Sequence, residues 1–423
     1  MIQTIRLSPS VTLRCCQDLR FRQGCLSLQF LRPMTAHEAA MNALLPSVLL
    51  RGTERHPDLR AITLRLDDLY GAAVGPLVRR IGDRHTTGLY CSFIDDRFAL
   101  SGDQILAPMV DFLRELMQRP IVEEGGFCRE FVESEKKNLI SAIESELNDK
   151  RAYAATRLLR AMCQADSFGI PRLGDKASIA KINAKALYAH YRKILRESPV
   201  ELFYVGSAAP ETVAGLLMPL FSIPERFPLS LPDQTPFRDS GSQTLQEEMD
   251  IIQSQLCMGF VTPITNRCSE FAAMQVLSHL FGGGMTSKLF LNVREKMSLC
   301  YSIGSGYYGA KGILTVSAGI DADKEETVRS EILAQLEACR QGDISEEELR
   351  AAREAIVSSL RSVHDSPGAI EGFYSTSILS GLPLSVEGYR RAVETVSLDA
   401  VAAAASTLRL HTTYFLKGVS VCS

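Results

Sequence analysis

Apolar residues are dense or alternate with polar ones along the first thirty positions, between short polar breaks. This pattern is typical of β-strands and predicts strands over Ile2–Leu7, Val11–Cys16 and Cys25–Leu31. Thr35–Leu50 is then predicted as a helix closed by an Arg-Gly-Thr turn, and Asp58–Leu69 as a second helix ended by a Tyr-Gly pair. The chain therefore opens with a run of strands followed by helices.

The pattern continues to residue 206. In the segment after Asp103, five apolar residues fall on one face at helical spacing, which predicts an amphipathic helix. These residues are Ile105, Met109, Phe112, Leu113 and Leu116. The other predicted elements are strands near Val74–Ile81 and Thr86–Ile94, a long helix over Phe127–Leu147, further helices to Leu195, and a closing buried strand over Pro199–Gly206.

A connector follows between residues 223 and 242. It has little apolar periodicity and carries four prolines, at positions 224, 228, 232 and 236. This composition is typical of an extended linker. We therefore expect one domain over residues 1–222, a linker over 223–242 and a second domain over 243–423, in agreement with a length of 423 residues.

Beyond the linker the order of elements recurs. The predicted elements are strands near Ser242–Met249 and Ser254–Thr262, a helix to Phe281, a glycine turn, a short helix to Val293, and strands near Cys300–Tyr308 and Ile313–Ala318. A helix-rich tail completes the chain. Its first apolar stripe is formed by Val328, Ile332, Leu336 and Cys339.

The two halves form a weak internal repeat. Tyr70 stands 18 residues after Gly52, and Tyr301 stands 18 residues after Gly283, each pair beside a turn between two helices. The matching order of elements favours duplication over chance. Because strands occur in runs beside runs of helices, the predicted fold class is α+β rather than a doubly wound parallel sheet.

Composition limits the function classes. The formal net charge is −3, and no basic stripe of the kind that binds nucleic acid is visible. The eleven cysteines include no Cys-x-x-Cys pair, which argues against zinc ribbons and thioredoxin-like sites. The N-terminus lacks the apolar core of a signal peptide, and no apolar run reaches about 20 residues. We expect a cytoplasmic protein with reduced cysteines.

The run Gly282-Gly283-Gly284 before a helix invites comparison with phosphate-binding loops. A Walker loop needs a glycine directly before its lysine, but Lys288 follows Ser287. The dinucleotide pattern also fails, because no third glycine has the required spacing. Taken alone, the three glycines indicate a flexible turn between packed helices.

The stretch from Gly282 to Ser302 is more specific as a whole. It contains Gly-Gly-Gly-Met-Thr-Ser-Lys-Leu-Phe, then Arg-Glu-Lys, then Leu-Cys-Tyr-Ser. It resembles the C-terminal signature of the insulinase/pitrilysin metallopeptidases. The resemblance implies that Arg294 and Tyr301, with the glycine turn, contact a bound peptide. Guanidinium groups suit peptide carbonyls and carboxylates, and a tyrosine hydroxyl can donate to an oxyanion. Without the surrounding match, an exposed arginine beside a half-buried tyrosine would be the simpler interpretation.

The metal half of the same resemblance is missing. The family begins its zinc site with His-x-x-Glu-His before a Gly-Thr pair, whereas no two histidines of this chain lie within five residues of each other. Alignment on Gly52-Thr53 places Ala43, Pro46 and Ser47 at the histidine, glutamate and histidine positions. None of these can ligate zinc as required, and Pro46 also lacks a backbone donor.

The third ligand position falls on a later helix. Glu135 matches a glutamate that the family keeps, and Ala142, seven residues on, stands where the family has its ligand. Glu144 and Glu146 lie close, so this alignment stays open. A second zincin-like motif, His37-Glu38-Ala-Ala-Met, ends in a thioether, which is a poor zinc ligand, and is interpreted as an ordinary helix start after Thr35.

The resemblance implies two similar α+β domains, each an antiparallel sheet flanked by helices. It further implies a non-catalytic, substrate-binding subunit of a heterodimeric zinc endopeptidase, with zinc held by an insulinase-family partner and no cofactor in this chain. Two other functions stay open. The chain could be a scaffold protein without a proteolytic role, or a peptide-binding module that acts without cleavage.

Limited proteolysis should cut the chain first within residues 223–242, because few core contacts are expected to cross an extended connector. The first-formed fragments can be identified by mass spectrometry. A preferred cut inside Ser254–Thr262 or Phe127–Leu147, with the connector intact, would count against this domain boundary.

Overall fold

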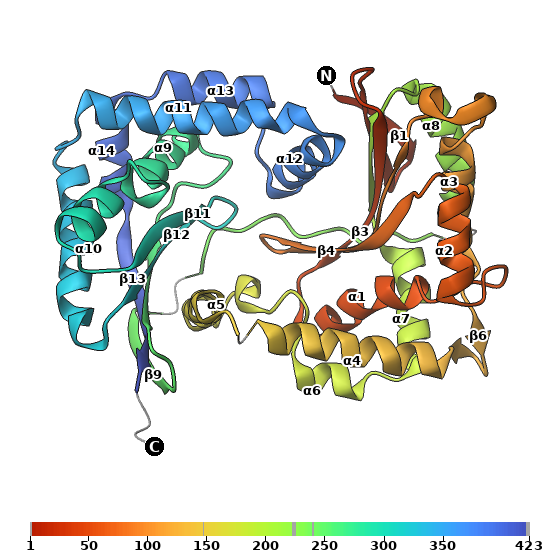
Figure 1. The fold of residues 1–423 in the computed structure, drawn as a ribbon, viewed down its shortest axis with the longest axis horizontal. Coiled ribbons are helices and arrows are strands. Elements are labelled where there is room, and N and C mark those ends of the chain that lie inside the picture. Colours follow the sequence, from red (N-terminus) through yellow and green to blue (C-terminus); the bar gives the residue numbers. More distant parts are fainter. Residues whose placement is uncertain (1, 147, 222–225, 239–240, 420–423) are drawn as a thin grey trace. The chain divides into compact units, whose positions relative to one another are not determined.

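The structure is a computed structural model that describes residues 2–146, 148–221, 226–238 and 241–419, and its chain divides into two units (Figure 1). The first unit contains the described parts of Met1–Ile143, Ile170–Asp233 and His364–Thr376. The second contains those of Glu144–Gly169, Gln234–Val363 and Ser377–Ser423. Each unit therefore includes one short segment from the opposite half of the sequence.

The first unit is built on a six-stranded sheet in the order β1-β2-β8-β3-β5-β4. All neighbours are antiparallel except β2 and β8, which are parallel. The strands are β1 Ile2–Ser8, β2 Val11–Gln17, β3 Gln23–Pro33, β4 Ala73–Ile81, β5 Arg84–Ile94 and β8 Val200–Gly206, with a separate small pair, β6 Val122–Glu123 and β7 Gly126–Phe127. The helices are α1 Ala36–Leu49, α2 Leu59–Asp68, α3 Leu106–Gln118, α4 Arg129–Ser145, α6 Lys176–Lys181, α7 Ala184–Glu197 and α8 Pro210–Leu217, with short 3₁₀ turns η1 Asp96–Phe98, η2 Leu100–Gly102 and η4 Met218–Phe221.

The second unit is built on a five-stranded sheet in the order β11-β12-β10-β13-β9. Here the one parallel pair is β13 with β9. The strands are β9 Gln243–Met249, β10 Ser254–Val261, β11 Ser302–Tyr308, β12 Ile313–Ile320 and β13 Arg409–Gly418. The helices are α5 Lys150–Met162, α9 Phe271–Gly282, the π-helix η5 Leu289–Lys296, α10 Glu325–Arg340, α11 Glu346–Ser362, α13 Val386–Glu394 and α14 Leu398–Thr407, with 3₁₀ turns η3 Ser167–Gly169 and η6 Ala322–Lys324. The turn η7 Val363–Asp365 and the helix α12 Pro367–Ser380 span both units, and His364–Thr376 belongs to the first.

The two sheets have the same topology. In the first, the series β2-β8-β3-β5-β4 begins with a parallel pair and continues with antiparallel pairs, and the series β9-β13-β10-β12-β11 repeats this in the second. Helices flank both sheets. The predicted α+β class, with two similar domains, is therefore confirmed, and each predominantly antiparallel sheet contains one parallel pair.

The side chains of strand β3 alternate between the two faces of the first sheet. Leu26 and Leu28 point to one face and pack with apolar side chains from α1, α3 and α7 in the main core of the unit. Ser27 and Gln29 alternate with them and therefore point to the other face. Both polar side chains are nevertheless buried. The second face must consequently be covered by a polar partner.

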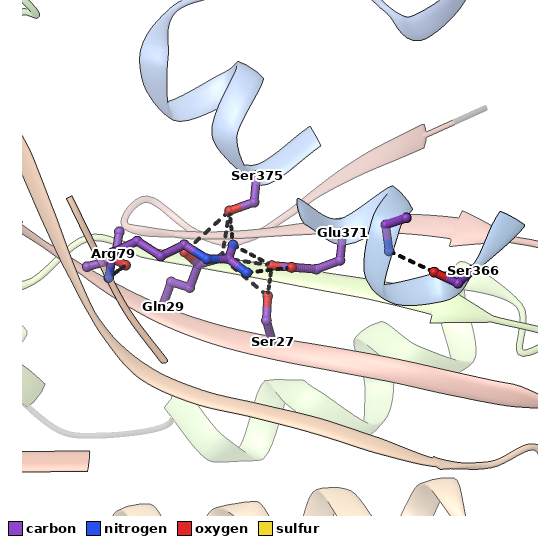
Figure 2. Close-up of polar contacts among 8 residues, drawn as sticks. Ser27, Gln29, Arg79, Ser366, Glu371 and Ser375 are labelled. Atoms are coloured by element: carbon purple, nitrogen blue, oxygen red, sulfur yellow. Dashed lines mark hydrogen bonds and ion pairs between the residues drawn. The ribbon is translucent and has the colours of Figure 1, made fainter. Parts of the chain in front are cut away.

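That partner is the start of α12 (Figure 2). The buried Glu371 carboxylate accepts hydrogen bonds from the Ser27 hydroxyl at 2.7 Å and from both terminal nitrogens of Arg79 at 3.0 and 2.8 Å. The Gln29 amide donates to the Ser375 hydroxyl at 2.9 Å, and Arg79 donates to the same hydroxyl. A segment more than 340 residues away in sequence thus satisfies the polar face of β3.

The second unit is completed in the equivalent way by α5. Ala154 and Leu158 of this helix pack against Cys257 of β10 and against Tyr414 and Leu416 of β13. The sheet face that they cover would otherwise expose apolar residues of two central strands. The burial of this surface holds α5, which follows α4 in sequence, in the second unit.

A buried ion pair follows α5. Asp166, between α5 and η3, lies 2.9 Å from the ammonium of Lys311 in the turn between β11 and β12. Both side chains are buried, and the Asp166 carboxylate also accepts a hydrogen bond from the Phe168 amide at 2.8 Å. Because a buried charge is costly without its partner, this pair fixes the segment after α5 to the second sheet.

Most elements predicted from the sequence are present, with ends shifted by a few residues. The predicted helix-rich tail is present between residues 325 and 407, but the strand that follows it, β13, a central strand of the second sheet, is not among the predicted elements. Of the predicted long helix, Leu147 lies outside the described residues, as do residues 223–225 and 239–240 of the predicted linker. Residues 226–238 form neither helix nor strand.

Two further observations concern the chain as a whole. No helix among the described residues is long and apolar enough to cross a membrane. The ten cysteines in the described ranges are free thiols, most of them buried, and burial raises the pKa of Cys15 and Cys25 to about 12. These thiols pack as small apolar side chains.

Asp166→Ala should destabilise the protein by about 3–5 kcal/mol, because it removes a buried carboxylate that lies 2.9 Å from the buried Lys311 ammonium. Urea unfolding followed by circular dichroism measures the change. The control is Glu337→Ala, which removes a largely exposed ion pair with Arg340 and should cost at most about 1 kcal/mol. Equal losses in the two variants would contradict the importance of the buried pair.

Candidate functional site

Helix α1 carries Ala43, Pro46 and Ser47, which the sequence resemblance aligns with the zinc-site positions of the metallopeptidases. Ala43 and Pro46 are buried, and Ser47 is half-buried. Pro46 cannot donate the helical hydrogen bond to the carbonyl of Asn42. The Thr87 hydroxyl of β5 donates to that carbonyl instead, at 2.7 Å. The helix therefore tolerates a proline where a catalytic glutamate would stand, because a neighbouring strand replaces the lost donor.

Helix α4 faces this region with Glu135. Its carboxylate lies 3.4 Å from the Arg51 guanidinium and accepts a hydrogen bond from Asn138 at 3.1 Å. Ala142, at the predicted third ligand position, is exposed. Within the described ranges no three His, Cys, Asp or Glu side chains come together in a group that could hold a metal ion. The residues at these positions do not fit a zinc ion, so no step of a zinc mechanism can be assigned to this chain.

A polar network that sequence reasoning missed lies beside these positions. The Asn42 amide donates to Nδ1 of His85 at 3.1 Å and accepts from Nε2 of His190 at 2.8 Å, and all three side chains are buried. Burial lowers the pKa of both histidines to about 4, so both are neutral at physiological pH. The three residues are far apart in sequence, so no local spacing links them.

The glycine run ends α9. A Cβ on Gly283 would lie 2.6 Å from the Cα of His279, and one on Gly282 would lie 2.8 Å from the backbone nitrogen of Ser305 in β11. Close backbone approach therefore requires glycine at these two positions, whereas Gly284 has more space. These contacts explain the packing of the turn. A contact of Gly282, Gly283 or Gly284 with substrate stays a prediction.

Arg294 and Tyr301 line one pocket of about 380 Å³ in the second unit. The Arg294 guanidinium stacks on the Phe290 ring at 4.6 Å from its centroid. The Tyr301 side chain is 60% exposed, and its hydroxyl donates to Asp321 at 2.9 Å. Lys324 contacts the second oxygen of Asp321, also at 2.9 Å. Asp321 and Lys324 were not singled out from the sequence, because they follow β12 and lie outside the recognised motif.

The backbone between the two residues determines this arrangement. Arg294 lies on η5, a π-helix, a form that occurs frequently at functional sites. The chain then turns through Ser298, whose φ of 51° is left-handed, and the Leu299 amide returns to the carbonyl of Val293. Tyr301 immediately precedes β11, where its amide donates to Gly319 of β12. Seven residues of sequence are thereby folded back so that both side chains reach one pocket.

The charges of the pocket are mutually stabilised. The hydrogen bond to the Asp321 carboxylate raises the pKa of Tyr301, so the phenol keeps its proton. Hydrogen bonds from Lys324 and Tyr301 lower the pKa of Asp321, which therefore stays ionised. The pocket offers a guanidinium, an ammonium and a phenolic donor beside two carboxylates, Asp321 and Glu295, the second of which lies 3.5 Å from Arg294. Such a set suits the carbonyl and carboxylate groups of a peptide.

Comparison with known proteins agrees with this description. Residues 181–356 match the family described as peptidase M16 inactive domain. The chain is 29% identical to the probable inactive metalloprotease YmfF of Bacillus subtilis (strain 168) over 98% of its own length and 97% of that protein. A conserved protein from Enterococcus faecalis V583 has a similar structure, with a TM-score of 0.91, 28% identity and full coverage of both chains. The peptidase M16 inactive domain from Pseudomonas fluorescens superimposes with a TM-score of 0.81, at 17% identity, over 99% of this chain and 98% of the other.

The fold and these matches together define a chain that resembles metallopeptidases but has no group of metal ligands among its described residues. Along nearly its whole length the chain is similar to a probable inactive metalloprotease, and residues 181–356 match the inactive domain of the insulinase/pitrilysin (peptidase M16) family. The resemblance recognised from the residues around Gly282–Ser302 is confirmed.

The purified chain should retain no zinc in its N-terminal half, because Ala43, Ser47 and Ala142 offer no ligands and Glu135 is already paired with Arg51. Elemental analysis after mild dialysis measures the metal content. Stoichiometric, tightly held zinc that survives mutation of the exposed histidine His37 would contradict this expectation.

Proposed function

We propose that this chain is the non-catalytic, substrate-binding subunit of a heterodimeric zinc metalloendopeptidase that processes peptides in the cytoplasm. In this proposal an insulinase-family partner supplies the zinc ion and the general base. This chain supplies Arg294, Tyr301 and the adjoining glycine turn. The proposal rests on the resemblance to this family and on a contrast between the two halves of the chain: the first lacks metal ligands, and the second keeps Arg294 and Tyr301.

The observation that carries the proposal is the contrast between two places in the chain. At the metal positions, every ligand type has been replaced, and the remaining carboxylate of Glu135 is occupied by Arg51. At the pocket of the second unit, Arg294 and Tyr301 are present and adjacent to one concave surface. The presence of Arg294 and Tyr301 in a chain without metal ligands favours a role in binding a peptide over the loss of every role in peptide processing.

The pocket can bind a peptide if the Tyr301 hydroxyl exchanges its hydrogen bond to Asp321 for one to the peptide. Arg294 stacks on Phe290, and one of its terminal nitrogens lies 3.5 Å from the largely exposed Glu295 carboxylate, so the other donors of its planar group can reach a carbonyl or carboxylate. Tyr301 donates to Asp321 in this structure, and the Lys324 ammonium provides an alternative partner for that carboxylate. When Lys324 satisfies Asp321, the Tyr301 hydroxyl can donate to a peptide oxygen.

The first unit provides an internal reference for Tyr301. Tyr70, which has the equivalent position after its glycine, also donates its hydroxyl to an acid, Asp103, at 2.6 Å. The tyrosine–carboxylate contact therefore recurs in both repeats and is compatible with a role in the fold alone. A functional role for Tyr301 requires that its removal affect the reaction more than the removal of the Tyr70 hydroxyl.

Two other functions remain candidates. A scaffold protein would need the fold but neither pocket residue, and a peptide-binding module would need both without a catalytic partner. The resemblance to this family fits all three. The pairing of Arg294 with Tyr301 at one pocket favours the two functions that involve a peptide.

The isolated chain should lack peptidase activity, and mixing it with its zinc-bearing partner should create activity. In that complex Arg294→Ala or Tyr301→Phe should lower turnover by about 10²–10³ where the lost donor acts on the transition state. Steady-state kinetics on a fluorogenic peptide measures kcat and KM separately. An effect confined to KM would mean that the two residues position the peptide in its ground state.

The controls are Lys296→Ala, an exposed cation on the same π-helix outside the pocket, and Tyr70→Phe. Both should leave kcat and KM unchanged. If Arg294 and Tyr301 can both be replaced without a change in kinetics or thermal stability, the substrate-binding role is wrong. Equal effects of Tyr301→Phe and Tyr70→Phe would assign both hydroxyls to the fold.

A further inference from the structure

A second pocket lies in the first unit, on elements that the proposed function does not use. It has a volume of about 670 Å³ and is bordered by the loop after α1, by α2, by α3 and by η4. Four arginines line it: Arg55 in the loop, Arg65 on α2, Arg114 on α3 and Arg119 at the end of α3. In a chain with a net charge of −3, such a concentration of guanidinium groups in one concavity requires an explanation.

Three of these four guanidinium groups have no hydrogen-bond or ion-pair partner among the described residues. Arg114 pairs with Asp111 at 2.8 Å. The side chains of Arg55, Arg65 and Arg119 make no hydrogen bond or ion pair with any residue that the structure describes. Three guanidinium groups therefore border one cavity, and their N–H donors have no acceptor among the described residues.

The acidic residues of the pocket compensate these charges only in part, although the nearby Arg55 charge helps to lower the pKa of Glu115. The Glu115 carboxylate, on the floor, is occupied by the Thr53 hydroxyl and by Nδ1 of His56, the latter at 2.8 Å. Burial opposes ionisation of Glu115, but these two hydrogen bonds lower its pKa, so it stays charged and internally paired. With Asp111 also paired, only the exposed Asp68 carboxylate faces the three unpaired arginines.

The lining indicates which anion would fit. Arginine forks match the oxygens of phosphate and carboxylate in a bidentate manner, and several forks from separate elements favour a ligand with more than one anionic group. Two aromatic rings line the pocket: Phe112 is buried, and the His56 ring covers it edge to face at 5.5 Å between centroids. Phe112 therefore has no open face on which a nucleobase could stack, and the His56 ring is held by Glu115.

We propose that this arginine pocket binds a compact polyanion carrying at least two phosphate groups. Arg55, Arg65 and Arg119 are its ligands, each contributing charge-assisted hydrogen bonds. Arg114 is held by Asp111 at the border, and the Thr53–His56–Glu115 contacts fix the floor. The site is separate from Arg294 and Tyr301 and does not depend on the function proposed for them.

Isothermal titration calorimetry of the full chain with inorganic pyrophosphate, at about 0.15 M ionic strength, tests this proposal. Saturable binding with a stoichiometry of one is expected, and orthophosphate should bind more weakly. Arg65→Ala and Arg119→Ala should each weaken pyrophosphate binding about tenfold or more, since each removes a charged donor. Arg65→Lys should recover only part of the loss, because lysine keeps the charge without the bidentate geometry.

The matched control is Arg60→Ala, on the same helix α2, exposed and outside the pocket, which should bind like the unaltered chain. Thermal unfolding without ligand should be the same for all variants, and Arg55→Ala in the loop serves if a helix variant is unstable. Absence of saturable binding, or an equal loss in Arg60→Ala, would overturn the proposal. Citrate binding as tightly as pyrophosphate would overturn the assignment to phosphate.

Discussion

The structure depends on a mutual exchange of segments, each anchored by a buried carboxylate. Glu371 at the start of α12 enters the first unit and is neutralised there by Arg79, with Ser27 and Gln29 completing its hydrogen bonds. The segment that carries α5 enters the second unit, where Asp166 is neutralised by Lys311. The two helices have equivalent places in the repeat, because α5 follows α4 as α12 follows α11. Neither sheet can bury both faces with residues from its own half of the chain, so the two units must be completed by the whole sequence.

This dependence explains why the fold can do without a metal. In a small metal-stabilised domain, loss of the ligands removes folding free energy directly. Here α1 is held by the apolar core of the first unit, and its contact with α4 is provided by the Arg51–Glu135 ion pair. Pro46 lacks the amide that would donate to the Asn42 carbonyl, and the Thr87 hydroxyl donates to that carbonyl instead. The ligand positions could therefore change to alanine, proline and serine while the sheet, the helices and the second-unit pocket stayed in place.

The sequence was sufficient for the elements whose signals are local, and insufficient for those that depend on distant partners. Helix starts at Thr35 and Asp58 were recognisable because both residues cap their helices through their own side chains. Strand β13 was missed, although its run of threonine, tyrosine and phenylalanine is typical of strands, because it follows a long helical stretch. The burial of Ser27 and Gln29 could not be anticipated, since the period of two assigns them only to the face opposite the core. At the candidate site, Arg294 and Tyr301 were found through a continuous motif. Asp321 and Lys324 come close to Tyr301 only when β11 and β12 pair.

The internal repeat also shows where the two halves differ in chemistry. Both repeats keep a tyrosine 18 residues after the glycine and a carboxylate that accepts its hydroxyl, Asp103 for Tyr70 and Asp321 for Tyr301. Arg294 stands eleven residues after Gly283, but the residue eleven positions after Gly52 is Thr63, an exposed threonine on α2. A tyrosine held by a carboxylate is thus common to both repeats, and the addition of a stacked guanidinium is specific to the second. Because a guanidinium beside the phenol adds planar charged donors that the first repeat lacks, the chemical distinction between the repeats lies in Arg294 more than in Tyr301.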